Sequence, residues 1–307
     1  MSQMAVLEYF DHERLDPLLG DGVRALPVER CDPAQVVAIV SGGGVTVDAG
    51  LLAAYPNARL AITGSTGYDH MDLDDLRSAG VAAYCTPDYC TREVADFALA
   101  CALAGLRGIV GLDRAMRAGV WNERAAGETH RVRGSVLGVI GLGKIGGMVA
   151  RDASALGMRV LASDPAGGDE RFAAAGAERV ELAELLATSD VVTLHAFYVR
   201  GSRPLLGAAE LALLKPGSIL VNAARSELLD LDALVEGLAH NRPGWAFMDV
   251  WDDEPPVPGD TRVDAPNLIL TPHAAWYSPE ADDALYLRIA EVAAAALRGE
   301  TARGLIT

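Results

Sequence analysis

The sequence predicts an α/β fold built on two doubly wound parallel sheets. Short apolar runs alternate with segments of helical periodicity along most of the 307 residues, which is typical of parallel sheets covered by helices. A glycine-rich turn in the middle of the chain follows one apolar run and opens a helix. The length allows two domains, each with its own core. Such sheets bind ligands beyond the carboxyl ends of their strands, so the residues directly after strands are the candidates for function.

The first part of the chain predicts one small sheet. Its expected strands cover 4–10, 36–40, 59–63 and 81–84, and its expected helices cover 15–19, 47–55 and 73–79. Glycine-rich loops follow two of these strands, at 42–44 and 64–67. The first loop either lets a ligand approach the backbone or simply connects a strand to a helix, and the second belongs to another unit of strand, glycine loop and helix. A long helix over 91–116, with apolar residues mostly on one side, is expected to join this sheet to the next.

The rest of the chain predicts a second parallel sheet. Strands are expected over 136–140, 159–162, 191–195, 218–222, 245–250 and 268–270. Helices are expected over 144–156, 182–187, 211–214, 231–239 and 279–298. Pro216 and Gly217 stop the third of these helices, and Gly299 lies just past the last one, as is usual at helix ends.

The motif Gly141-x-Gly143-x-x-Gly146 stands between the strand over 136–140 and the helix after it. The first glycine allows a tight turn, the second lets the backbone approach a pyrophosphate, and the third lets the helix pack on the strand. The helix N-terminus offers N–H groups and partial positive charge to the phosphates. Asp164 ends the next strand, 18 residues after Gly146, near the ~20 expected for a carboxylate that binds ribose hydroxyls. The pattern predicts NAD rather than NADP; the alternative is an ordinary turn with a solvated aspartate.

Composition limits the classes of function. The formal net charge of −16 argues against nonspecific binding to nucleic acid. No apolar run approaches the ~20 residues of a membrane span, and the first ten residues show no secretory signal. The cysteines have no metal-ligand spacing, so we expect no metal site and a reducing, cytoplasmic location; they are Cys31, Cys85, Cys90 and Cys101.

Three polar residues stand just after strands in the second half of the chain: Arg225, Glu254 and His273. A guanidinium can hold a carboxylate through two bonds and polarise the neighbouring carbonyl. An imidazole can give a proton to the carbonyl oxygen as hydride reaches the carbon. A carboxylate beside the imidazole favours its charged form and orients the ring. The alternatives are an exposed arginine, a solvated acidic turn and a capped histidine. His195, at the end of an expected strand, is expected to be structural rather than catalytic.

Six motifs are spread along the whole chain: Gly64-Ser-Thr-Gly-Tyr-Asp, Val94-Ala-Asp, Gly141-Leu-Gly-Lys-Ile-Gly, Leu220-Val-Asn-Ala-Ala-Arg225, Asp249-Val-Trp-Asp-Asp-Glu254-Pro and Thr271-Pro-His273. Together they resemble the D-isomer-specific 2-hydroxyacid dehydrogenase family. The resemblance implies two Rossmann-like domains and a homodimer. The substrate domain would be built from both chain ends, 1–100 and 276–307, and the NAD-binding domain would cover 101–275.

The resemblance also implies roles for individual residues. Arg225 would bind the carboxylate and carbonyl of the substrate, His273 would be the acid/base, and Glu254 would pair with it. N–H groups around Thr66 and Gly67 would meet the substrate's carboxylate, and Asp249 would meet the nicotinamide amide. The residues expected at the cofactor are Thr66, Gly141, Gly143, Lys144, Ile145, Gly146, Asp164, Ala223 and Asp249.

Within the family, the segments 87–96 and 266–278 most resemble the branch of C-terminal binding proteins. These are NAD-linked transcriptional corepressors with dehydrogenase chemistry. In that branch a tryptophan at the place of Trp276 lines the substrate pocket; the alternative is plain core packing.

The chain departs from the family pattern in three places. The loop over 196–204 replaces a segment rich in proline and threonine, and its Arg200 and Arg203 either attract an anion or face solvent. Ser226 follows Arg225 where glycine is usual, which matters because serine disfavours positive φ. Trp245 replaces a small residue.

The sequence therefore predicts an NAD-dependent oxidoreductase that interconverts a 2-oxo acid and a D-2-hydroxy acid. Its expected partner is this small molecule, with no direct nucleic-acid or membrane partner. Two alternatives remain. One is an NAD(H)-sensing scaffold like the corepressors, and the other is an enzyme of specialised metabolism that acts on a phosphonate or another unusual anion.

Overall fold

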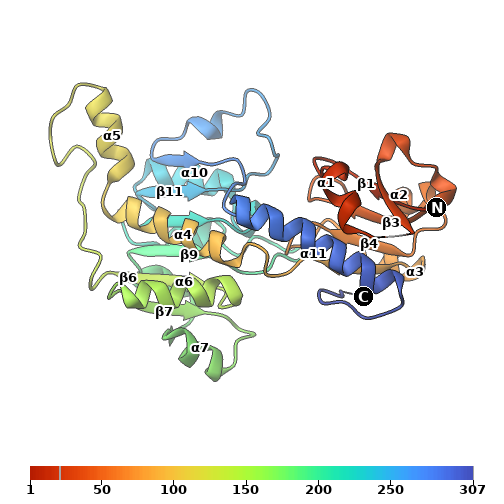
Figure 1. Cartoon of the computed structure of the whole chain (residues 1–307). Coiled ribbons are helices and arrows are strands. Elements are labelled where there is room, and N and C mark those ends of the chain that lie inside the picture. The colour runs from red at the N-terminus through yellow and green to blue at the C-terminus, as the bar shows by residue number, and fades with distance from the viewer. Residues whose placement is uncertain (21, 307) are drawn as a thin grey trace. The chain divides into compact units, whose positions relative to one another are not determined.

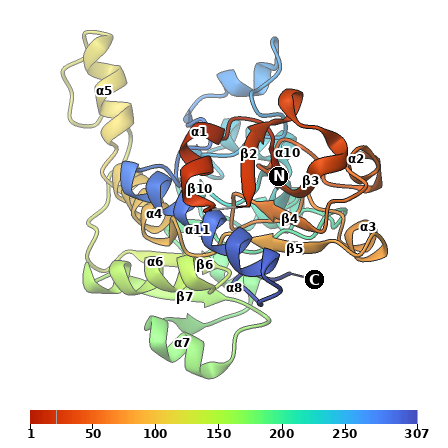
Figure 2. The same ribbon diagram turned by 45° about the vertical axis from the view of Figure 1, so that its right-hand side comes forward.

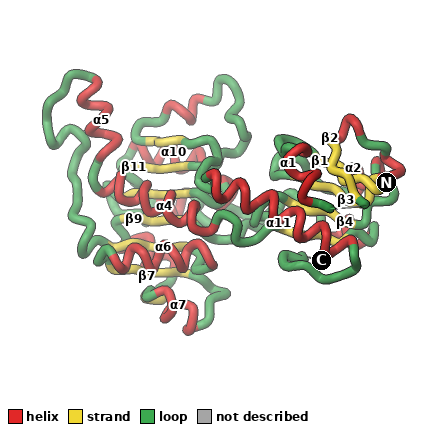
Figure 3. Tube along the Cα trace, viewed as in Figure 1, coloured by secondary structure: helices red, strands yellow, loops and turns green. Residues whose placement is uncertain are grey.

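The computed structural model describes residues 1–20 and 22–306. Backbone contacts divide the chain into unit 1, which consists of Met1–Cys90 and Tyr277–Thr307, and unit 2, which is Thr91–Trp276. Each unit is a parallel sheet with accompanying helices (Figures 1 and 3). The predicted α/β fold with two parallel sheets is thus confirmed. The expected domain limits stay a prediction; residue 100 lies inside one continuous helix, α4 (Thr91–Leu106).

Unit 1 contains a five-stranded sheet with the order β2-β1-β3-β4-β5. Its strands are β1 (Ser2–Val6), β2 (Val23–Pro27), β3 (Val36–Ser41), β4 (Leu60–Thr63) and β5 (Ala82–Cys85). Its helices are α1 (His12–Leu15), α2 (Ala49–Ala54), α3 (Leu73–Ser78) and α11 (Pro279–Leu297). Helix α11 comes from the other end of the sequence and contacts α1 and β4 (Figure 2). Both ends of the chain therefore build this unit.

Two features of unit 1 differ from the expectation. Strand β1 ends at Val6 rather than near residue 10, because Glu8 has a φ of 59° and a strand cannot continue through the left-handed region. The edge strand β2 (Val23–Pro27) was not predicted at all. Its short run contains Arg24 and ends in Pro27, both of which weaken a strand pattern.

Unit 2 contains a seven-stranded sheet with the order β12-β11-β10-β9-β6-β7-β8. Its strands are β6 (Val136–Ile140), β7 (Arg159–Ser163), β8 (Glu178–Arg179), β9 (Val191–Leu194), β10 (Ile219–Asn222), β11 (Trp245–Met248) and β12 (Leu268–Leu270). Its helices are α4 (Thr91–Leu106), α5 (Ile109–Arg117), α6 (Lys144–Ala155), α7 (Asp169–Ala175), α8 (Leu182–Thr188), α9 (Ala208–Leu211) and α10 (Leu231–Ala239).

The two faces of this sheet have separate cores. On one face, α4 and α6 pack on β6 and β10 through side chains such as Ala98, Val149 and Val139. On the other face, α8 and α10 contribute leucines such as Leu185 and Leu234. Because both faces are covered, the strands read as continuous apolar runs, which is why the sequence located most of them.

The long helix expected over 91–116 is broken in the structure. Helices α4 and α5 are bent by 59° at the break, where Gly108 has a φ of 61°. Helix α5 packs against the indole of Trp245. A Cβ on Gly111 would lie 2.9 Å from Cζ2 of this ring, and the Arg114 guanidinium lies 5.8 Å from the ring centroid. No single helix in the described part is long and apolar enough to cross a membrane, although the bent pair passes that test by length and composition.

Candidate active site

The carboxyl ends of β6 and β9 mark the switch point of the unit 2 sheet. From β6 the chain proceeds outward to β7 and β8, and it then returns to β9 on the other side of β6. Doubly wound sheets bind their ligands at such a point. The glycine loop leaves β6 here, and a Cβ on Gly141 would lie 2.6 Å from the backbone nitrogen of Ala196, just after β9. The predicted nucleotide loop therefore lies at the switch point.

The three motif glycines have different surroundings. Gly141 has a φ of 88°, and a Cβ on Gly146 would collide with the carbonyl oxygen of Gly141. Gly143, in contrast, has no atom within 4 Å of the place where its Cβ would be. It is the N-cap of α6, and no side chain caps this helix. Open space beside an uncapped helix N-terminus fits the pyrophosphate of a dinucleotide.

Asp164 is held beside this loop. Its Oδ2 accepts a hydrogen bond from the Leu142 N–H at 2.8 Å, and its Oδ1 accepts one from the Ala166 N–H at 3.0 Å. Nη1 of Arg171 lies 3.4 Å from Oδ2. The carboxylate thus ties the glycine loop to the end of β7, in the position that the predicted contact with a ribose requires.

Arg225, Glu254 and His273 follow three neighbouring strands, β10, β11 and β12, at one edge of the sheet. Asn222 at the end of β10 is buried and shapes the first of these turns: its Oδ1 accepts from the Ala224 N–H at 3.0 Å, and its Nδ2 donates to the Arg225 carbonyl at 2.8 Å. Ser226 begins a short 3-10 helix, a conformation with negative φ. The serine is therefore accommodated without the strain that a positive φ would bring.

The second and third of these residues form a pair. Nδ1 of His273 lies 2.7 Å from Oε2 of Glu254, and the two side chains are 42% and 40% exposed. The other carboxylate oxygen of Glu254 accepts from the Trp251 N–H at 3.0 Å. Trp251 belongs to the core, and its indole donates to Asp260 at 2.9 Å. Because Nδ1 is engaged, Nε2 is the ring atom that can exchange a proton with a ligand.

The surroundings of Glu254 keep it ionised. Burial alone would raise the pKa of its carboxyl, but the hydrogen bond from His273 and the charge of that ring lower it. The Trp251 N–H and the positive charge of Arg225 lower this pKa further, so the net shift is downward. The structure therefore brings all three predicted residues into one electrostatic group.

Asp249 is 2% exposed and organises the loop that carries His273. Its Oδ1 accepts from the Thr271 hydroxyl at 2.6 Å and from the Ala274 N–H at 2.9 Å, and its Oδ2 accepts from the Ala275 N–H at 2.8 Å. The backbone N–H of His273 donates to the Asp249 carbonyl at 2.8 Å. These bonds hold His273 at a φ of 51°. The family resemblance implies that Asp249 contacts the nicotinamide amide, which stays a prediction; this supporting role was not expected from the sequence.

The segment after β9 contains one further histidine and two arginines. Burial lowers the pKa of His195 to about 4, so its ring is neutral near pH 7; its Nε2 lies 2.9 Å from the Thr193 hydroxyl. Arg200 lies in a turn in which the Gly201 N–H donates to the Tyr198 hydroxyl at 3.1 Å. Arg200 and Arg203 are both exposed.

The remaining predicted residues lie elsewhere. Thr66 and Gly67 belong to unit 1, in the loop after β4, where the Ser65 carbonyl accepts from the Thr86 N–H at 3.0 Å. Thr66 is exposed and Gly67 is half-buried. Trp276 is half-buried and is the last residue of unit 2. Ala223, half-buried, lies between Asn222 and Arg225 in the turn after β10.

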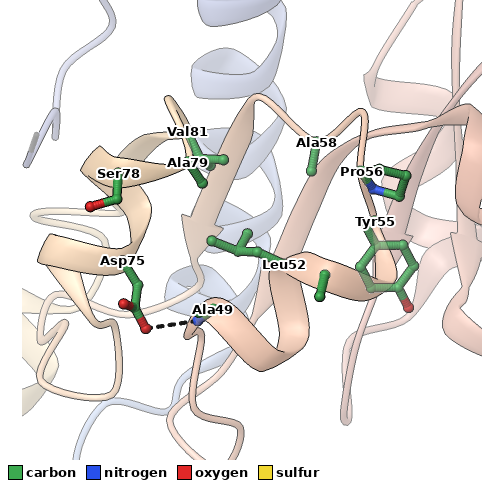
Figure 4. A pocket seen from close by; sticks show the side chains of 10 residues that line it. Ala49, Leu52, Tyr55, Pro56, Ala58, Asp75, Ser78, Ala79 and Val81 are labelled. Carbon is green, nitrogen blue, oxygen red and sulfur yellow. Dashed lines mark hydrogen bonds between the residues drawn. The ribbon is translucent and has the colours of Figure 1, made fainter.

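A hollow of about 400 Å³ lies between α2 and α3 of unit 1 (Figure 4). Its one charged lining residue, Asp75, accepts a hydrogen bond from the Ala49 N–H at 2.8 Å. Ala58 and Val81 of its wall precede β4 and β5, so they lie at the amino ends of these strands. The hollow contains none of the candidate residues, and we assign no role to it.

The glycine loop over 141–146 and the N-terminus of α6 can hold a dinucleotide at the switch point, and we call them the dinucleotide cradle. An arginine and a histidine–carboxylate pair lie farther along the same carboxyl-end side of the sheet. This is the arrangement of a nicotinamide-dependent oxidoreductase. Residues 99–275 match the family model described as "D-isomer specific 2-hydroxyacid dehydrogenase, NAD binding domain". The chain is also 34% identical over 284 residues to glyoxylate reductase of Korarchaeum cryptofilum, which covers 91% of this chain and 83% of the relative. The chain therefore belongs to the D-isomer-specific 2-hydroxyacid dehydrogenase family, whose cofactor is NAD.

Two further relatives show the breadth of the match. D-3-phosphoglycerate dehydrogenase of Archaeoglobus fulgidus is 35% identical over 254 residues, which are 83% of this chain but 48% of the relative. This chain thus spans about half the length of that protein. The crystal structure of the TT0316 protein from Thermus thermophilus superposes with a TM-score of 0.87 at 28% identity, over 99% of this chain and 100% of that one. These relatives do not show the expected corepressor-like branch, which stays a prediction.

Gly143 and Gly146 offer a matched test of the cradle. Gly143→Ala places a methyl group in open space, so we expect the dissociation constant of NADH to rise at least about tenfold while the free energy of unfolding changes by less than about 0.5 kcal/mol. Gly146→Ala drives a methyl group into backbone and should lose about 1–3 kcal/mol of stability. For each variant, fluorescence titration with NADH measures the dissociation constant, and urea denaturation measures the free energy of unfolding. Normal NADH binding by Gly143→Ala would mean that the cofactor does not use this cradle.

Asp249→Asn tests the support of the His273 loop. An asparagine presents an amide NH₂ where three donors converge, so at least one buried N–H loses its acceptor at a cost of about 1–3 kcal/mol. We expect that loss in urea denaturation followed by tryptophan fluorescence. The control is Asp253→Asn, an exposed carboxylate in the same segment, which should stay within about 0.5 kcal/mol of the parent. Equal stability of the two variants would contradict the supporting role.

Proposed function

We propose that the protein interconverts a 2-oxo acid and a D-2-hydroxy acid, with NAD(H) as the redox partner. The observation that carries the proposal is the His273–Glu254 pair beside Arg225, at the edge of the sheet that holds the dinucleotide cradle. When it is bound, NADH supplies a hydride for the carbonyl carbon. The similarity to a glyoxylate reductase supports a 2-oxo acid as substrate.

In this proposal each residue has one task. The Arg225 guanidinium binds the substrate's carboxylate and polarises the neighbouring carbonyl. Nε2 of His273 donates a proton to the carbonyl oxygen during reduction and accepts it during oxidation. Glu254 favours the charged imidazolium and fixes the ring through Nδ1. Thr66 and Gly67 offer N–H groups to the carboxylate, and Trp276 borders the substrate.

We also infer a cytoplasmic homodimer from the family resemblance. Large apolar side chains on and after α5 support the dimer, because Ile109, Met116 and Trp121 are 57%, 50% and 89% exposed. Exposed apolar surface of this kind is commonly covered by a partner.

The two alternative functions make different demands. A scaffold that only senses NAD(H) would not need a proton donor on a supported loop, so the His273–Glu254 pair favours the enzyme. An enzyme for a phosphonate would use Arg200 and Arg203, which are exposed on a turn after β9.

The proposed function is tested with NADH and NADPH in parallel against glyoxylate, hydroxypyruvate, branched and aromatic 2-oxo acids, and phosphonopyruvate. NADH oxidation with a 2-oxo acid supports the proposal, and no turnover of any member, with NADH still bound, contradicts it.

His273→Gln tests the proton donor. Loss of general acid catalysis should lower kcat by about 10²- to 10⁴-fold, whereas the dissociation constant of NADH should stay within about twofold because the cradle is not altered. Steady-state kinetics and NADH titration separate the two effects. An equal loss of turnover and of NADH binding would indicate that His273 is structural.

Glu254→Gln tests the charge beside that ring. The substitution keeps the size of the side chain but removes the negative charge that favours the imidazolium. We expect kcat to fall at least about tenfold, whereas the dissociation constant of NADH should stay within about twofold because the glycine loop is not altered. Steady-state kinetics and NADH titration measure the two values. Asp253→Asn serves as a control for the loss of one negative charge, and an equal fall of kcat in both variants would argue against a specific pair.

A further inference from the structure

Asp164, directly after β7 in unit 2, is held in place mainly by backbone. Its two carboxylate oxygens accept hydrogen bonds from the N–H groups of Leu142 and Ala166, and its side chain is 12% exposed. An ionised carboxylate has lone pairs for about four hydrogen bonds, so the same oxygens can also accept from the hydroxyls of a ribose. A ligand at this place therefore meets a carboxylate whose position is fixed.

Helix α7 brings a positive charge to this carboxylate. Nη1 of Arg171 lies 3.4 Å from Oδ2 of Asp164, which is longer than the ~2.7–2.9 Å of a well-formed charge-assisted hydrogen bond. The Arg171 side chain is 49% exposed. Glu170 precedes it in the helix, but consecutive helical side chains do not face each other. Arg171 is thus a loosely held cation beside the expected position of the ribose.

Two further arginines of this part of the sheet have carboxylate partners at other places. Arg179 of β8 lies 3.2 Å from Asp169. Arg159 lies 2.7 Å from Glu178, and it is the first residue of β7, so it stands at the opposite end of this strand from the ribose-binding carboxylate. Of the three arginines, Arg171 is therefore the one placed to contact a ligand there.

We propose that the protein binds NADPH as well as NADH, and that Arg171 binds the 2′-phosphate. A carboxylate at the end of this strand suits the free 2′-hydroxyl of NAD, and an arginine nearby accommodates the 2′-phosphate of NADP. This chain carries both groups. Arg171 stays paired with Asp164 when NADH binds and turns to the phosphate when NADPH binds, where its planar guanidinium can donate two hydrogen bonds.

This inference adds a second coenzyme to the NAD that Asp164 predicts from the sequence. All the groups that carry it belong to unit 2. It concerns the binding of the coenzyme and does not depend on which substrate is reduced. The test is therefore made without a substrate, and its result stands apart from the outcome of the proposed reaction.

Fluorescence titrations of the purified protein measure the dissociation constants of NADH and NADPH. For the parent we expect the two constants to lie within about a hundredfold of each other, because NADPH loses a charge-assisted hydrogen bond to Asp164 and gains one to Arg171. In Arg171→Gln the constant for NADPH should rise at least about tenfold and that for NADH less than about threefold. Arg171→Lys keeps the charge without the planar fork, so it should weaken NADPH binding by less than Arg171→Gln does.

The matched control is Arg159→Gln, which removes the same charge at the other end of β7. Both of its dissociation constants should stay within about twofold of the parent values, because solvent and salt screen the distant charge. Asp164→Asn supplies the converse change. It removes the repulsion of the 2′-phosphate and releases Arg171 from its partner, so NADPH should bind more tightly and NADH more weakly. Adding Arg171→Gln to this variant should abolish the gain.

Two results would overturn the role of Arg171. One is a parent that binds NADH but shows no NADPH binding at concentrations about a hundredfold above the dissociation constant of NADH. The other is a folded Arg171→Gln variant, as judged by urea denaturation, that weakens both coenzymes equally. If Arg171→Gln does not fold, Arg171→Lys decides, since it should weaken NADPH alone. A parent that binds neither coenzyme contradicts the dinucleotide cradle, and the inference fails with it.

Discussion

The buried carboxylate of Asp249 is the interaction on which the rest of the site depends. Its own backbone N–H donates to the Asn222 carbonyl at 2.9 Å, and its side chain holds the loop that carries His273. Asn222 in turn shapes the turn that carries Arg225. Hydrogen bonds therefore connect neighbouring segments at the carboxyl ends of the strands, from the end of β10 to the end of β11 and on to the loop after β12. These backbone hydrogen bonds set the spacing between Arg225, the proposed anion-binding group, and His273, the proposed proton donor.

The residues that support the site are buried, whereas the groups proposed to act are partly exposed. Asn222 and Asp249 are almost entirely buried, and so is Trp251, whose N–H orients Glu254. The groups proposed to act, at Glu254 and His273, are about two-fifths exposed. Buried polar groups are costly unless they are hydrogen-bonded, and here their bonds hold backbone in place. The arrangement leaves the reactive atoms open to a ligand while restricting their position.

The glycine loop and the three candidate residues could be picked out of the sequence because both signals are local. The glycine motif lies between a strand and a helix, and Arg225, Glu254 and His273 each stand just after a strand. What the sequence did not show depends on contacts between distant segments. Asp249 was placed inside the strand expected over 245–250, and its bonds to Thr271, Ala274 and Ala275 exist only because β11 and β12 are neighbours. The break at Gly108 was hidden because the residues after it continue the apolar pattern, although several are exposed. The turn at Glu8 was likewise absorbed into an apolar run, since a positive φ in a residue other than glycine leaves no trace in the pattern.

The return of α11 to unit 1 has a consequence for biosynthesis. Leu285, Ile289 and Val292 of this helix are buried, and the Ile306 N–H donates to the Ala83 carbonyl at 2.8 Å. The first sheet therefore lacks part of its core and a hydrogen-bond partner until the segment after residue 276 has left the ribosome. Unit 2 is continuous in sequence and is synthesised before that segment. On the nascent chain, at ~5–20 residues per second, the later-encoded unit can reach its native state while the earlier one is still incomplete, which reverses the usual N-terminal-first order of cotranslational folding.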